Sequence, residues 1–245
     1  MNNSESIEAR FVTLERQLDR LRAYQEIQSV MARYEVIHTP AQINRSSEVF
    51  AMTRDDVSVE ISDWGVWRGP EALRHLFEEV MNVPRKGTVT EHHLTTPMIE
   101  VAGDGQTAKA VFWSPGFEIL PTIGDQAAGD PRDNEIRTYW AWGKYAADFI
   151  RESGKWKIWH LKWFRLLRTD YYKSPVDAYR EVMTGAPNRS DFPGVEPPTF
   201  HHPYSADDER TPVPVNPEPY ESYQGEFDWW FGEWKDRLGY VPPQY

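Results

Sequence analysis

Apolar residues recur every three or four positions along the first part of the chain, which is the spacing of an amphipathic helix. They are Ile7, Phe11, Leu14, Leu18, Leu21, Ile27, Val30, Met31 and Tyr34. Pro40 ends this pattern, because proline cannot continue a helix. We therefore predict one long amphipathic helix from about Ile7 to His38.

Shorter helices and a series of strands are predicted beyond it. Helices are expected over Ile43–Met52, from Gly69 to about Met81 with Pro70 at an early helical position, and over Pro175–Met183. Runs rich in apolar and β-branched residues predict the strands Val57–Ile61, Val89–Val101, Thr107–Ile119, Ile136–Ile150 and Lys155–Thr169. Helices followed by long strands predict an α+β fold with a curved antiparallel sheet.

The last two predicted strands form the most distinctive feature of the chain. Tyr139–Phe149 and Lys155–His160 are aromatic, strongly β-forming runs, and a tight charged turn containing Gly154 joins them. We predict a long antiparallel hairpin, one face of which lines a deep pocket.

The composition changes after Gly185, where proline becomes frequent. A proline-rich tail alone indicates a linker, but this one also carries Trp229, Trp230 and Trp234, which disordered tails avoid. We divide the chain into a domain over residues 1–185 and a C-terminal arm over residues 186–245. The arm is expected to pack on its own barrel or a neighbouring subunit and to end in a short helix near Glu226–Leu238.

Charge and composition exclude several classes of function. A formal net charge of -11 disfavours nucleic acid and anionic membranes as partners, and the lack of cysteine excludes disulfides and thiolate catalysis. No apolar run reaches membrane-spanning length and the first residues are polar, so a cytoplasmic location is the expectation.

Recognised metal and nucleotide motifs are also missing. Adjacent His92 and His93 would point to opposite faces of a strand, which disfavours joint metal binding. Neither a glycine-rich phosphate loop nor a serine nucleophile elbow is present. Any chemistry is therefore expected to be proton transfer without a cofactor.

Four motifs, in this order, resemble the SnoaL-like proteins of the NTF2-like superfamily. They are Tyr34 with His38-Thr39, the segment Val66–Leu73, the segment Glu91–Asp104, and the hairpin around Tyr145. Together they cover roughly residues 20–170. The resemblance implies a cone-shaped α+β barrel with a curved antiparallel sheet and a long N-terminal helix.

Scytalone dehydratase, an enzyme of this superfamily, serves as a template for the pocket. It uses a Tyr-Asp pair after the first helix, two histidines on adjacent strands and an asparagine on the penultimate strand. The resemblance places on these positions, in turn, His38-Thr39, His92, Phe112 or Trp113, and Tyr145. One catalytic residue type is thus retained, so the resemblance does not carry that dehydration over.

Strand alternation completes the predicted pocket. If Tyr145 and Leu161 point inward, then Arg137 and Tyr139 on one strand and Trp159 and Trp163 on the other should follow. Aromatic walls with phenols and a guanidinium suit a flat, oxygen-bearing aromatic ligand. Glu60 is expected to face solvent.

His92 is the strongest candidate for the general acid or base, since histidine titrates near neutrality. Several alternatives stay open: His38 as a cation at a helix end, Tyr34 as core, His93 as structural, and Arg137 as a solvated strand-end charge. The predicted catalytic residues are His92, Tyr34, His38, Tyr145 and Arg137. The predicted substrate-binding residues are Tyr139, Trp163, Phe112, Trp113, Trp159, Leu161 and His93.

Two hypotheses of function follow. The first is a cofactor-independent lyase that eliminates water or formaldehyde from a hydroxylated aromatic molecule. The aromatic-rich chain and its arm also resemble the lignin diarylpropane lyase (γ-formaldehyde lyase) type, which makes a stilbene. The alternative is a ligand-binding or assembly subunit, like the small subunits of ring-hydroxylating dioxygenases. A small aromatic substrate and a homo-oligomer, dimer or trimer, are the expected partners.

Overall fold

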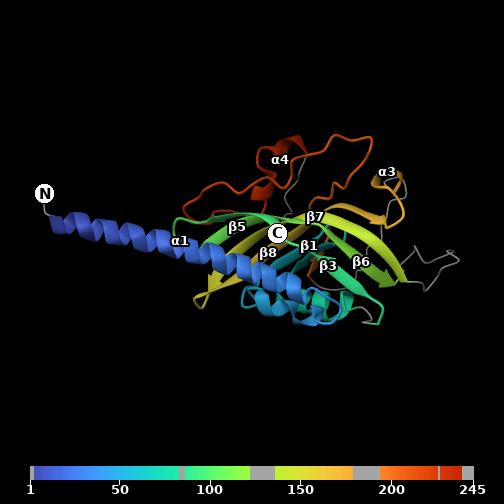
Figure 1. Cartoon of the computed structure of the whole chain (residues 1–245), viewed down its shortest axis with the longest axis horizontal. Coiled ribbons are helices and arrows are strands. Elements are labelled where there is room, and N and C mark those ends of the chain that lie inside the picture. Colours follow the sequence, from blue (N-terminus) through green and yellow to red (C-terminus); the bar gives the residue numbers. More distant parts are fainter. Residues whose placement is uncertain (1–2, 83–85, 122–135, 179–193, 226, 239–245) are drawn as a thin grey trace.

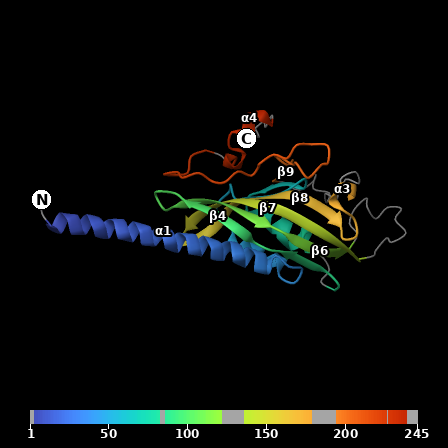
Figure 2. The same cartoon turned by 45° about the horizontal axis from the view of Figure 1, so that its top comes forward.

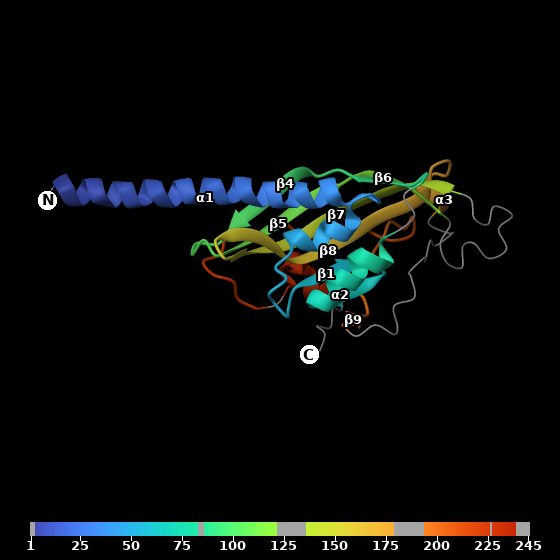
Figure 3. The same ribbon diagram turned by 90° about the horizontal axis from the view of Figure 1, so that it is seen from below.

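A long helix, a strongly curved sheet and a C-terminal arm form three layers (Figure 1). The computed structural model describes residues 3–82, 86–121, 136–178, 194–225 and 227–238. Helices cover one face of the sheet and the arm crosses the other, which we call the outer face (Figures 2 and 3). The fold class is thus the predicted α+β architecture with a long N-terminal helix.

The helical segments follow the apolar periodicity closely. The first helix and the helix that opens at Pro70 are confirmed, and the latter ends in a π-helical turn. The segments are α1 (Asn3–Ile37), η1 (Ile43–Val49), α2 (Pro70–His75), η2 (Leu76–Val80), α3 (Pro175–Ala178), η4 (Trp229–Phe231) and α4 (Trp234–Arg237).

Nine described strands build one sheet, in the order β3-β6-β7-β8-β1-β2-β9, with β5 beside β7 and β4 beside β5. Their bounds are β1 (Ser58–Ile61), β2 (Gly65–Arg68), β3 (Val89–His92), β4 (Thr95–Val101), β5 (Thr107–Ser114), β6 (Gly116–Pro121), β7 (Ile136–Glu152), β8 (Lys155–Asp170) and β9 (Val195–Glu196).

The sheet is mixed, which corrects the expectation of a purely antiparallel one. β1 runs parallel to β8, with Ser58 opposite His160 and Ile61 opposite Trp163. About a hundred residues separate these two strands, so their pairing does not depend on a tight turn and either direction is open to it. The other strand pairs are antiparallel.

Two predicted long strands are each divided in two, and this division builds the site. The segment Val89–Val101 separates into β3 and β4 at His93-Leu94, and Thr107–Ile119 separates into β5 and β6 at Pro115. Proline lacks the N–H that a central strand needs, which explains the second break. As a result β3 pairs with β6 and β4 pairs with β5.

The hairpin of β7 and β8 is confirmed, and two register shifts alter which side chains face inward. One shift lies between Trp142 and Gly143, opposite Leu167 and Arg165, and the other lies between Asp148 and Phe149, opposite His160 and Ile158. Each leaves one extra residue on β8, which reverses the inward and outward alternation beyond it.

The arm packs on the outer face through aromatic residues. Trp230 and Phe231 are fully buried, in one apolar cluster with Val111 and Ala146 of the sheet. Backbone N–H groups of Gly103 and Asp104 donate to arm carbonyls. Part of the predicted arm, residues 186–193, 226 and 239–245, lies outside the described residues, as does most of the predicted helix Pro175–Met183.

The arm also covers Glu60, which was expected to face solvent. Its carboxylate is buried, and it accepts hydrogen bonds from the Lys162 ammonium and from the backbone N–H of Thr199 at 2.8 Å. The sequence could not reveal this cover, because Thr199 is 139 positions away.

None of the described helices contains a long apolar segment that could cross a membrane.

Candidate active site

A cavity opens on the inner face of the sheet, where α1 and η2 approach it. Its empty volume is about 1020 Å³, including space open to solvent. Its walls come from the helical segments and from strands β3, β6, β7, β8 and β1, which are consecutive in the sheet order. The lining residues are Tyr34, His38, Val59, Glu60, Ile61, Trp64, Val80, Met81, Thr90, His92, Glu118, Leu120, Tyr139, Tyr145, Leu161, Trp163, Arg165 and Arg168.

His92 is the last residue of β3, and its position depends on Gly116 of β6. The two residues face each other across the strand pair. A Cβ atom at position 116 would lie 2.3 Å from the Glu91 carbonyl oxygen and 2.9 Å from the His92 ring. Glycine at this position therefore lets the imidazole lie flat against the neighbouring strand.

Glu118 of β6 brings a carboxylate to the imidazole of His92. It lies two residues beyond Gly116 on the same face of β6. Its Oε1 lies 3.3 Å from Nε2 of His92, and its Oε2 accepts a hydrogen bond of 2.8 Å from Nε of Arg168. The three side chains form a buried chain of alternating charge: imidazole, carboxylate and guanidinium.

Charge within this chain shifts both pKa values. Burial lowers the pKa of His92, but the hydrogen bond and the negative charge of Glu118 outweigh it and raise the pKa above its usual value. Burial raises the pKa of Glu118, yet Arg168 and His92 together hold it well below the usual range. Glu118 is thus an anion that stabilises a positive charge on His92.

His38 provides a contrasting imidazole at the end of α1. Its ring centroid lies 5.8 Å from that of His92 and 5.0 Å from that of Tyr34. Burial, together with the charge on His92, lowers its pKa to about 3, so this imidazole is neutral near pH 7. Two neighbouring histidines with opposite pKa shifts are suited to different roles in acid–base chemistry.

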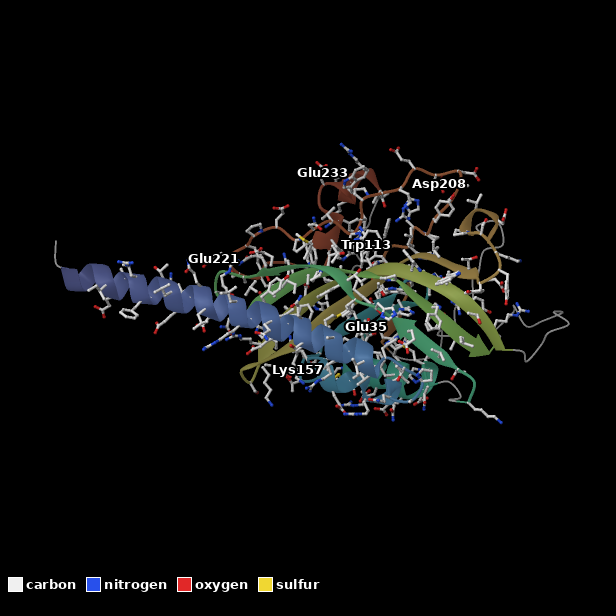
Figure 4. All side chains as sticks on the ribbon, in the orientation of Figure 1. Glu35, Trp113, Lys157, Asp208, Glu221 and Glu233 are labelled. Carbon is white, nitrogen blue, oxygen red and sulfur yellow. The ribbon has the colours of Figure 1, made fainter. Side chains whose placement is uncertain are left out.

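A second carboxyl group, Glu35, lies near the end of α1 (Figure 4) and is not among the residues that line the cavity. Burial raises its pKa to about 7, although the charge on His92 and the Tyr145 hydroxyl act to lower it. Burial, followed by the charge on Glu35, raises the pKa of Tyr145 well above its usual value. Tyr145 therefore remains a phenol, able to donate a hydrogen bond.

Aromatic rings form the remaining walls. The Arg168 guanidinium lies 4.2 Å from the ring centroid of Tyr139, and the Trp163 ring lies 5.1 Å from that of His92. Gly143 makes room for Trp163, because a Cβ there would lie 2.6 Å from the indole nitrogen. Such walls favour a flat apolar ligand with a few polar substituents.

Seven of the predicted site residues line this cavity and five do not. Those that line it are His92, Tyr34, His38, Tyr145, Tyr139, Trp163 and Leu161. Those that lie elsewhere are Arg137, Phe112, Trp113, Trp159 and His93.

Each of the five has a different environment. Phe112 belongs to the apolar core, whereas Trp113 and His93 are exposed. Arg137 lies opposite Leu120 near the start of β7, and it does not line the cavity. Trp159 is the extra residue at a register shift, so it turns outward and its indole N–H donates to Asp56.

Sequence reasoning missed Glu118, Arg168 and Glu35. Glu118 fell within a segment predicted as a single strand, and only the break at Pro115 determines its face. Arg168 lies beyond a register shift, where simple alternation from Trp163 assigns the wrong side. Pro115 was the one signal in the sequence that pointed to such a break.

The site offers no clear metal centre among the residues that the structure describes. No three histidine, aspartate or glutamate side chains in these ranges gather closely enough to hold an ion. The groups available for chemistry are the imidazoles, carboxyls, phenols and guanidinium described above.

Solved structures with this fold include enzymes named for elimination reactions. A hexachlorocyclohexane dehydrochlorinase, LinA type 2, is 19% identical, with a TM-score of 0.50 over 64% of this chain and 95% of its own. A candidate scytalone dehydratase from Novosphingobium aromaticivorans is 16% identical, with a TM-score of 0.51 over 65% and 94%. These likenesses show the fold.

Sequence comparison identifies the family. A comparison with curated proteins finds no match. The SnoaL-like domain profile matches residues 19–162, which is more than half of the chain. The matched part contains both His92 and Glu118. The chain therefore belongs to the SnoaL-like domain family.

Proposed function

We propose that this protein is a cofactor-independent lyase that eliminates water or formaldehyde from a hydroxylated aromatic small molecule. The observation that carries the proposal is the arrangement of His92: a buried imidazole, supported by the Glu118 carboxylate, in a cavity with aromatic walls. Its Nδ1 is buried and has no hydrogen-bond partner among the described residues, and we infer that a bound substrate supplies that partner.

The proposed chemistry begins with proton abstraction by neutral His92. In a dehydration the proton comes from carbon, hydroxide leaves from the neighbouring carbon as water, and a double bond forms. In a deformylation the proton comes from a hydroxymethyl group, formaldehyde departs as the carbon–carbon bond breaks, and a benzylic hydroxyl leaves as water. Glu118 stabilises the imidazolium that results in either case. The imidazolium then gives this proton to the departing hydroxide, which leaves as water and regenerates neutral His92.

The remaining polar groups orient the substrate. Tyr139 and Tyr145 line the cavity as phenols, and neutral His38 adds a hydrogen-bonding group without a charge. Arg168 holds Glu118 in place and adds no free base. The names of the two structural neighbours, a dehydrochlorinase and a candidate dehydratase, both denote eliminations and support this reaction class.

The substrate class is tested with the purified protein and no added cofactor. A panel of hydroxylated aromatic compounds should include lignin-derived diarylpropane diols, whose deformylation releases formaldehyde and gives a strongly absorbing stilbene. We expect turnover of at least one compound, which a formaldehyde assay and the change in absorbance would measure. Binding of panel members without any product would instead favour a ligand-binding module.

A further inference from the structure

The N-terminal half of α1 projects beyond the sheet (Figure 1), and it carries a row of exposed apolar side chains. Each member is between 47% and 69% exposed. Their spacing alternates between four and three residues, which is the seam pattern of a coiled coil. They are Ile7, Phe11, Leu14, Leu18 and Leu21.

This row lies on a different side of the helix from the residues that hold α1 to the sheet. The buried stripe consists of Ala23, Ile27, Met31 and Tyr34. At 3.6 residues per turn the two stripes lie on roughly opposite sides of α1. The protein's own sheet therefore cannot cover the seam, which corrects the prediction of a single amphipathic face along the whole helix.

The orientation of the helix is fixed where it leaves the body. Arg20 donates to Glu100 of β4 at a distance of 2.7 Å. Beyond this ion pair towards the N-terminus, every described side chain of α1 from Glu8 to Asp19 is exposed. An apolar seam on a helix held in this way is available to another chain.

We propose that this seam binds the same segment of a second copy, with the two helices parallel and in register. Charge supports this occupant. In a parallel pair, the residue that precedes the seam position Phe11 on one helix faces the residue that follows the next seam position, Leu14, on the other helix. That rule places Arg10 against Glu15 of the partner subunit, twice in the dimer. The next such position pairs Gln17 with the partner's Arg22, which adds no like-charge contact.

The antiparallel alternative is less favourable. Centred on the same seam, it brings the two Glu15 carboxylates together across the axis. The parallel pair also has space along the body, because Gln25, Ala32 and Val36 continue on the seam side of α1 and are exposed. The two bodies would then lie on opposite sides of the helix pair.

Light scattering after size-exclusion chromatography tests the seam. The double variant Leu14→Glu/Leu18→Glu should have half the mass of the wild-type particle. The control Ala9→Glu, which adds a charge on the opposite face of the helix, should leave that mass unchanged. Wild-type protein that runs as a single 28.6 kDa chain overturns the proposal, and so does a double variant of unchanged mass. Circular dichroism checks that both variants remain folded.

Disulfide trapping tests the direction, since the chain contains no cysteine. Phe11→Cys and Leu18→Cys, made separately, should each form a linked dimer under mild oxidation, and Arg16→Cys on the opposite face should not. An antiparallel pair can link at most one of the two seam positions, which would overturn the parallel arrangement. A monomer that instead sediments with phosphatidylcholine–phosphatidylglycerol vesicles would assign the face to lipid.

Discussion

The two faces of the sheet each bury a carboxylate beside a histidine, and they use the pair differently. On the inner face, Glu118 shares its oxygens between His92 and Arg168, and the imidazole borders a cavity. On the outer face, Asp148 lies 2.8 Å from Nδ1 of His160 and is fully buried. The pairs are alike in chemistry and differ in what surrounds them.

The arm determines that difference. Asp148 also accepts hydrogen bonds of 2.7 Å from the Tyr223 hydroxyl and from the Trp229 indole N–H, both of which belong to the arm. Three donors saturate this carboxylate and fasten the arm to the sheet. Asp148 is therefore occupied in holding the arm, whereas Glu118 holds Arg168 and the histidine that borders the inner cavity.

Replacing the inner histidine should produce the largest change in turnover. His92→Ala removes the proposed base, so turnover should fall by about 10²–10⁴-fold while the affinity for an aromatic ligand, which depends on Tyr139 and Trp163, changes far less. Steady-state kinetics and equilibrium titration separate the two quantities. His93→Ala, one residue away and exposed, is the matched control. Unchanged turnover in His92→Ala would move the base role to His38.

Replacing the outer carboxylate should affect stability instead. Asp148→Ala leaves buried donors of His160, Tyr223 and Trp229 without an acceptor, which should lower the free energy of unfolding by about 3 kcal/mol. Tyr223→Phe removes one hydroxyl and should cost about 1 kcal/mol. Urea unfolding measures both variants. A folded Asp148→Ala protein that loses turnover would mean that the outer pair takes part in the chemistry.

Replacing the inner carboxylate should have the smallest effect of the three and should change the pH profile. Loss of a hydrogen bond to a charged partner costs about 1.5–3 kcal/mol, or roughly 10–10²-fold in turnover for Glu118→Gln. The base form of His92 exists above its pKa, and Glu118 raises that pKa. Without this charge the rise of kcat/KM with pH should therefore occur at lower pH.

Glu91→Gln is the control for this shift, because Glu91 is exposed and precedes His92 on β3. The same change of charge at that position should leave the profile close to wild type. An equal shift of the kcat/KM pH profile in Glu118→Gln and Glu91→Gln would show that net charge, and not the contact of Glu118 with His92, sets the pKa of the imidazole.

The sequence by itself determined the local elements. The apolar period predicted α1, proline predicted where helices begin and end, and the aromatic β-forming runs predicted the hairpin of β7 and β8. These signals depend on neighbours only a few residues apart. The resemblance of four sequence motifs to SnoaL-like proteins placed His92, Tyr34, His38 and Tyr145 in one pocket, and the structure brings them to one cavity.

Only the tertiary structure decided which side chains meet across the sheet. The break at Pro115 puts Glu118 beside His92, register shifts turn Trp159 outward and Arg168 inward, and the arm buries Glu60 and Asp148. A single extra residue reverses the face of every position beyond it, and a distant segment contributes no local periodicity. The carboxylate partner of His92 was thus invisible until the strands were paired.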